Sequence, residues 1–90
     1  MDTEEAREHL RSFVSELRGL TYEALREKCK GGMTRDFTTR NGNWYQVEAL
    51  VMWDDKKKRN IRVSTAIDDG VSRAITEDFI MTPEGSVLDG

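Results

Sequence analysis

Apolar and polar residues alternate between residues 44 and 53, which is the clearest periodic stretch of the chain. Successive side chains of a β-strand point to opposite faces, so this stretch predicts a strand with two different sides. One side is wholly apolar and is expected to face the core: Tyr45, Val47, Ala49, Val51 and Trp53. The other side is expected to face away from the core: Trp44, Gln46, Glu48, Leu50 and Met52.

Turns that contain Asn-Gly or Asp-Gly flank the predicted strands, and turn length fixes the register of a hairpin. A three-residue loop at positions 40–42 places Phe37 opposite Tyr45 and on the core face. A two-residue loop at the same place would point Phe37 outward. We therefore predict the three-residue loop.

The same reasoning applies to the turn at residues 68–70. A three-residue loop pairs Ile67 with Val71 and Val63 with Ile75, which matches apolar with apolar residues. A two-residue loop would instead pair these apolar residues with polar ones. We again predict the longer loop.

The last predicted strand is less regular. We expect an irregularity at Glu77-Asp78 that lets Phe79 and Met81 reach apolar surroundings. Residues 83–85, Pro-Glu-Gly, predict a turn with proline at its second position.

The N-terminal part has helical periodicity. Between Asp2 and about Arg18, apolar residues recur at three-and-four spacing: Ala6, Leu10, Phe13, Val14 and Leu17. Asp2 or Thr3 can cap the start of this helix. Gly19 suits the left-handed position that ends a helix, and Thr21 can cap a second helix to about residue 28. A single helix through Gly19 is the alternative, because the apolar spacing continues beyond it.

These elements predict an α+β fold. One or two N-terminal helices pack on one face of a four-stranded antiparallel meander with strand order 1-2-3-4. Residues 1–90 form a single domain. It has a helical part at 2–30, a sheet part at 33–82, and a C-terminal turn and tail at 83–90.

Composition excludes some function classes. Charged residues make up 34% of the chain with both signs mixed, and the net charge of −3 argues against general nucleic-acid binding. The single cysteine, Cys29, cannot form an intramolecular disulfide and is typical of a reducing compartment. No apolar run approaches the length of a signal sequence or a membrane span. We expect a cytoplasmic protein without membrane contact.

Candidate catalytic residues are few. The meander separates Asp54-Asp55 from Asp68-Asp69 by the length of a strand, so these carboxylates cannot form one site. The single histidine, His9, and Cys29 lie near opposite ends of the helical part. No phosphate-binding glycine loop is present. We expect no enzymatic activity, no cofactor and no metal site.

The basic loop, Lys56, Lys57, Lys58 and Arg59, is the one dense run of positive charge. It contains no aromatic residue for base stacking and follows two aspartates, so a solvated hairpin tip explains it best. The alternative is contact with phosphate or an acidic partner, which would make the protein a small-molecule or nucleic-acid binder that uses the loop at 56–59.

The side of the sheet away from the helices is the strongest candidate site. It is expected to carry few charges, chiefly Glu48 and Arg62, although the chain is rich in charge. A solvated sheet face usually carries more charge than this. We predict an interface with a protein partner or a second copy, through Trp44, Leu50, Met52, Ala66 and Ala74. Alternatively, the C-terminal segment with Phe79, Met81, Val87 and Leu88 covers this face.

Five short runs stand out in residues 44–86: Trp53-Asp54-Asp55, Asn60-Ile61-Arg62-Val63, Ile67-Asp68-Asp69-Gly70, Asp78-Phe79-Ile80 and Pro83-Glu84-Gly85-Ser86. Together they resemble a family of small bacterial proteins that has the same helix-then-meander layout and no assigned activity. Residues 17–22 are similar more loosely. The resemblance implies a bacterial origin and this fold, and it carries no catalytic residues over to this chain.

Overall fold

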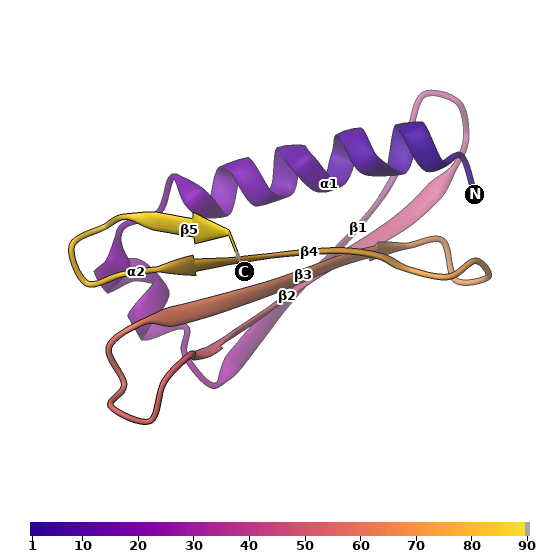
Figure 1. Ribbon diagram of the computed structural model, residues 1–90. Coiled ribbons are helices and arrows are strands. Elements are labelled where there is room, and N and C mark those ends of the chain that lie inside the picture. The colour runs from indigo at the N-terminus through magenta and orange to yellow at the C-terminus, as the bar shows by residue number, and fades with distance from the viewer. Residues whose placement is uncertain (90) are drawn as a thin grey trace.

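The computed structural model describes residues 1–89 as two helices and one five-stranded antiparallel sheet. The elements are α1 (Thr3–Arg18), α2 (Tyr22–Glu27), β1 (Gly31–Thr38), β2 (Trp44–Trp53), β3 (Ile61–Asp68), β4 (Ile75–Met81) and β5 (Val87–Asp89). Each strand pairs with its neighbour in sequence (Figure 1). The α+β meander is confirmed, with a fifth strand where a tail was expected.

Two separate helices are present, as the predicted caps imply. The Asp2 carboxylate accepts a hydrogen bond from the Glu5 N–H (3.1 Å), and the Thr21 hydroxyl accepts one from the Ala24 N–H (3.1 Å). The expected left-handed glycine is wrong, because Gly19 has a right-handed φ of −78°. The extended backbone of Thr21, with ψ 160°, redirects the chain instead.

The first hairpin has the predicted register. Phe37 pairs with Tyr45, and the Thr39 N–H donates to the Asn43 carbonyl (2.9 Å) across a three-residue loop. Gly42 has a φ of +84°, which L side chains rarely adopt. The turn therefore depends on this glycine.

The predicted pairing of β3 with β4 is wrong. Ile67 pairs with Ile75 rather than Val71, and Val71 is 93% exposed in a six-residue connection, 69–74. The Asp69 carboxylate accepts hydrogen bonds from the N–H groups of Val71 (3.0 Å) and Ser72 (2.6 Å), which organises this wider loop. The shift of four residues is even, so Ile75 still points to the core face.

The expected irregularity at Glu77-Asp78 is also wrong. The β3–β4 pairing is continuous from Ile67 to Ile61, with Thr65 opposite Glu77. Phe79 and Met81 reach the core because a regular strand that begins at Ile75 brings them to the same face.

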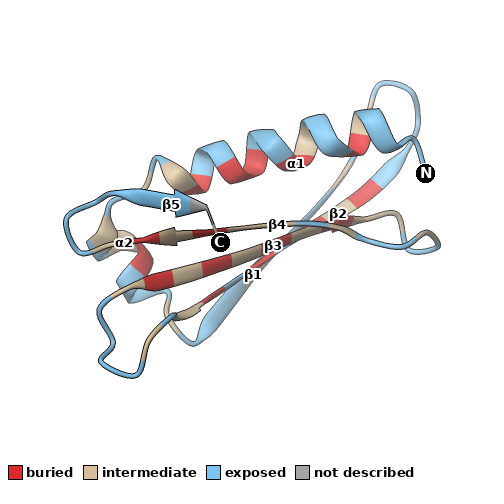
Figure 2. Ribbon diagram, in the orientation of Figure 1, coloured by how far each residue is buried: buried red, intermediate tan, exposed pale blue. Residues whose placement is uncertain are grey.

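The core lies between α1 and one face of the sheet. The helix packs on β2, β3 and β4, and α2 closes the end of β3. In Figure 2, buried positions alternate with more exposed ones along β2 and β3. The buried apolar residues are Ala6, Leu10, Phe13, Val14, Leu17, Leu25, Tyr45, Val47, Ala49, Val51, Ile61, Val63, Ile67, Phe79 and Met81.

Candidate interaction surface

The outer face is the side of the sheet that points away from both helices (Figure 1). Strand alternation and the registers place these residues on it: Gly32, Thr34, Asp36, Thr38, Trp44, Gln46, Glu48, Leu50, Met52, Arg62, Ser64, Ala66, Asp68, Thr76, Asp78, Ile80 and Leu88. No element formed by residues 1–89 packs over it. The outer face is therefore not covered by residues 1–89, as a docking surface requires.

Four of the five predicted interface residues lie on the outer face. Trp44 is 42% exposed and Leu50 is 54% exposed, whereas Met52 and Ala66 are half-buried among their neighbours. Ala74 is exposed but lies in the loop after β3 and not on a strand, so its placement was wrong. The reason is the four-residue error in the β3–β4 register.

Two apolar residues of this face, Ile80 and Leu88, were not predicted from the sequence to lie on it. Ile80 pairs with Leu88 across β4 and β5, and Leu88 is 47% exposed. Strand β5 lies beside β4 and extends the sheet, so the alternative in which the C-terminal segment covers the outer face is wrong. The Pro83 turn followed by two apolar residues was the signal for this short strand.

The apolar residues of the outer face form two separate groups. Leu50, Met52, Ile80 and Leu88 form the Leu50 patch, with Arg62 between its β2 and β4 members. Trp44 lies six residues from Leu50 on β2, about 20 Å away, and its ring approaches Gly70. A polar strip that includes Gln46 and Glu48 separates them.

The outer face carries more charge than the sequence analysis predicted, because Asp36, Asp68 and Asp78 also point to it. Arg62 donates from Nε to Asp54 (2.9 Å) and from a terminal guanidinium nitrogen to Asp78 (3.3 Å). The hydrogen bond to Asp54, more than that to Asp78, raises the pKa of Arg62. Its charge is therefore balanced within the chain.

The basic loop lies at the same end of the sheet as the Leu50 patch, between β2 and β3. All four of its basic side chains are exposed, and none forms an ion pair within the part of the chain that the structure describes. The Tyr22 hydroxyl donates to the Arg59 carbonyl (2.7 Å), and the Arg59 N–H donates to the Asp55 carboxylate (2.8 Å). The loop backbone is therefore anchored while its charges remain available.

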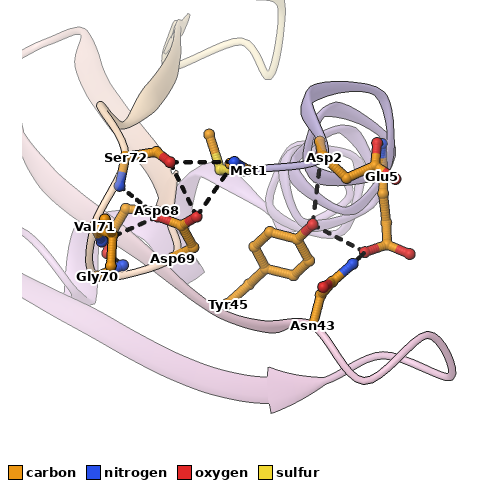
Figure 3. A network of polar contacts seen from close by, with 10 residues as sticks. All are labelled: Met1, Asp2, Glu5, Asn43, Tyr45, Asp68, Asp69, Gly70, Val71 and Ser72. Atoms are coloured by element: carbon orange, nitrogen blue, oxygen red, sulfur yellow. Dashed lines mark hydrogen bonds and ion pairs between the residues drawn. The ribbon is translucent and has the colours of Figure 1, made fainter.

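A network of polar contacts at the opposite end was not predicted (Figure 3). The Glu5 carboxylate accepts hydrogen bonds from Asn41 (2.8 Å), Asn43 (2.9 Å) and the Tyr45 hydroxyl (2.9 Å). These bonds, led by that from Asn43, lower the pKa of Glu5. Burial, helped by Glu5, raises the pKa of Tyr45 to about 12. The network ties the start of α1 to the first hairpin.

Asp69 belongs to the same end of the molecule. Backbone N–H groups, first that of Ser72, hold its pKa at about 2, and the amino group of Met1 lies 3.7 Å from its carboxylate. A lowered pKa is the opposite of what a general acid needs near neutral pH. These carboxylates organise the loops at this end of the molecule.

His9 and Cys29 lie apart. The His9 ring packs at a tilt of 49° against the Phe37 ring (4.9 Å between ring centroids) at the hairpin end of β1, whereas Cys29 precedes the other end of that strand. Burial raises the pKa of Cys29, which makes its thiol less reactive. Among residues 1–89, no three histidine, cysteine or acidic side chains are grouped closely enough to hold a metal ion.

A cavity of about 230 Å³ lies between α1 and β1, lined by His9, Phe13, Phe37 and other residues. Its two charged groups already pair with each other, because the Arg35 guanidinium lies 3.0 Å from the Glu16 carboxylate. Small-molecule sites are usually larger than this. The cavity is therefore a weaker candidate than the outer face.

Comparisons of the chain with family models, curated proteins and solved structures find no match. The helices formed by residues 1–89 are all too short or too polar to cross a membrane.

Proposed function

We propose that this protein is a non-enzymatic interaction module that self-associates through its outer face. The observation that carries the proposal is the one-sided packing of the sheet. Both helices lie on one face, and the other face exposes Trp44, Leu50 and Leu88, three of the large apolar side chains most accessible in the fold. Exposed apolar groups gathered on one face are typical of interfaces.

The size of the outer face supports a second copy as the partner. A five-stranded sheet whose longest strand, β2, has ten residues presents roughly 30 by 20 Å, or about 600 Å² per copy. Two such faces would bury about 1,200 Å², which is within the range of specific interfaces. A second copy offers a surface of matching shape and extent.

Quenching of Trp44 fluorescence tests the proposal directly. In a Trp53→Phe variant, Trp44 is the only remaining tryptophan. We expect acrylamide to quench it less at high protein concentration than at low concentration, because association shields the outer face. Quenching that is independent of concentration across a range in which the protein associates would show that another surface is used.

A second candidate function is anion binding by the basic loop. The observation that favours it is the exposure of four basic side chains, Lys56 to Arg59, that form no ion pair within residues 1–89. Replacing all four with glutamine should abolish binding of a short single-stranded oligonucleotide at low salt. Equal binding by the wild type and the variant would remove this candidate. Because the net charge is −3, self-association is the stronger proposal.

We also propose a cytoplasmic location in a bacterial cell. The free, half-buried thiol of Cys29 suits a reducing compartment, and the bacterial origin rests on the sequence resemblance alone. Fractionation of cells that express the protein would test the location, and recovery outside the cytoplasm would contradict it.

A further inference from the structure

We propose that the two copies pack with their β2 strands antiparallel, so that Trp44 of each copy lies on the Leu50 patch of the other. This inference rests on the self-association proposed above and adds which parts of the two faces meet. Two identical sheets stacked face to face are related by a two-fold axis that lies between them. That axis runs either along the strands or across them, and the two choices bring together different ends of the outer face.

The first observation is the separation of the apolar groups. Trp44 and the Leu50 patch lie at opposite ends of β2. An axis along the strands would bring the Trp44 end over the same end of the partner. An axis across the strands brings each Trp44 over the β2 part of the partner's Leu50 patch, so Trp44 and Leu50 cover each other.

The second observation is charge, which differs between the two ends of the molecule. Figure 1 shows which segments lie at each end. The acidic end comprises the N-terminus, the first hairpin and the β3–β4 loop, residues 1–5, 36–45 and 66–74. Its side chains include six acidic and two basic residues, and the amino group of Met1 adds one positive charge, so the net charge of this end is −3. Asp36 and Asp68 bring this charge onto the outer face itself.

The basic end comprises α2, the basic loop and the β4–β5 turn, residues 22–31, 52–62 and 78–86. Its side chains include eight basic and six acidic residues, a net charge of +2. The electrostatic interaction between the two copies therefore has a different sign for the two choices of axis. An axis along the strands would bring acidic end to acidic end, whereas an axis across them brings each acidic end over a basic end.

The third observation is the register of polar residues near the axis. If the axis crosses β2 at Val47, Trp44 lies over the partner's Leu50 and Gln46 lies over the partner's Glu48. The Gln46 amide can then donate a hydrogen bond to that carboxylate. An axis at Glu48 would instead place two carboxylates opposite each other, which is unfavourable.

The twist of the sheets leaves this register intact near the axis. Sheets packed face to face cross at about 30°. Trp44 lies three residues from the axis, about 10 Å, so its sideways displacement is about 5 Å. A displacement of about 5 Å is one strand spacing, so the indole ring lies beside Leu50 and over its small cross-strand neighbour, Gly32 or Ser64.

A pair of complementary variants tests the arrangement. Trp44→Arg and Leu50→Glu should each lower the association constant at least tenfold when alone, because every symmetric dimer loses both Trp44–Leu50 contacts. In an equimolar mixture, one contact is intact and the other becomes an arginine–glutamate pair. We expect the mixed dimer to form at least tenfold more tightly than either variant with itself, measured by sedimentation equilibrium.

The outcomes separate this inference from the proposed function. If the wild type is a dimer and the mixture recovers nothing, the antiparallel arrangement is wrong while self-association stands. If the wild type is monomeric, both are wrong. Circular dichroism of each variant shows whether it is folded.

Salt provides a second measurement that needs no variant. With basic ends over acidic ends, raising NaCl from 50 to 300 mM should weaken the wild-type dimer several-fold, because the attraction is screened. Association that strengthens with salt would indicate that the acidic ends meet, and would overturn the inference.

Discussion

Replacing Leu50 with glutamate should separate the copies and leave each of them folded. Leu50 is 54% exposed, so about half of its side chain remains to be buried by a partner. Full burial of a leucine is worth about 1.5–3 kcal/mol, which gives roughly 0.8–1.6 kcal/mol per copy. A symmetric dimer contains two such contacts, so the loss is about 1.6–3.2 kcal/mol, or roughly 15- to 200-fold in Kd.

The same substitution should change the free energy of unfolding of the monomer by no more than about 1 kcal/mol, because the side chain is largely outside the core. Val51 supplies the contrast. It is the next residue of β2, it points to the helices and it is 1% exposed. Val51→Glu would bury an unpaired carboxylate and should unfold the protein. Ser15→Glu, on the exposed side of α1, controls for the added charge alone.

Sedimentation velocity and urea unfolding of the three variants give the decisive comparison. We expect Leu50→Glu to be folded and monomeric, Val51→Glu to be unfolded, and Ser15→Glu to associate like the wild type. If Leu50→Glu unfolds as Val51→Glu does, the outer face is part of the core. If it stays folded and associates normally, the interface lies elsewhere.

Three further predictions concern the fold. Tyr45→Phe removes the hydroxyl that donates to Glu5 and should cost about 1 kcal/mol in urea unfolding; an unchanged midpoint would show that the network in Figure 3 adds no stability. Because the pKa of Asp69 is about 2 and that of Glu5 is lowered, the unfolded chain binds more protons than the folded one, so stability should fall as pH drops from about 4 to 2. Asp69→Asn should reduce that fall, and an equal fall in both proteins would contradict the assignment. Phe79→Ala, at a fully buried site, should cost about 3–5 kcal/mol, and a loss below 1 kcal/mol by thermal unfolding would refute its place in the core.

Sequence reasoning succeeded where one local physical rule decides the structure. The alternation from Tyr45 to Trp53 determined which side of β2 faces the helices, and the side-chain cap at Thr21 determined where α2 begins. Gly42 alone supplies the positive φ that the first hairpin needs. In each case the residues that determine the structure are neighbours in the chain.

Sequence reasoning failed where hydrogen bonds between a side chain and the backbone compete with the short turn that an Asp-Gly sequence predicts. The Asp69 carboxylate accepts hydrogen bonds from the N–H groups of Val71 and Ser72, which stabilises a six-residue connection. Strand β4 therefore pairs with β3 four residues later than predicted, and Ala74 lies outside the sheet. Strand β5 has only three residues, too few for a periodic signal. Because β5 was not predicted, Leu88 was not assigned to the Leu50 patch.

The most direct test of self-association is the solution mass of the wild-type protein, measured by light scattering over a concentration series. The proposed dimer predicts a mass that approaches twice the chain mass of 10.3 kDa at high concentration and falls toward 10.3 kDa on dilution. A mass of 10.3 kDa at every concentration would contradict it.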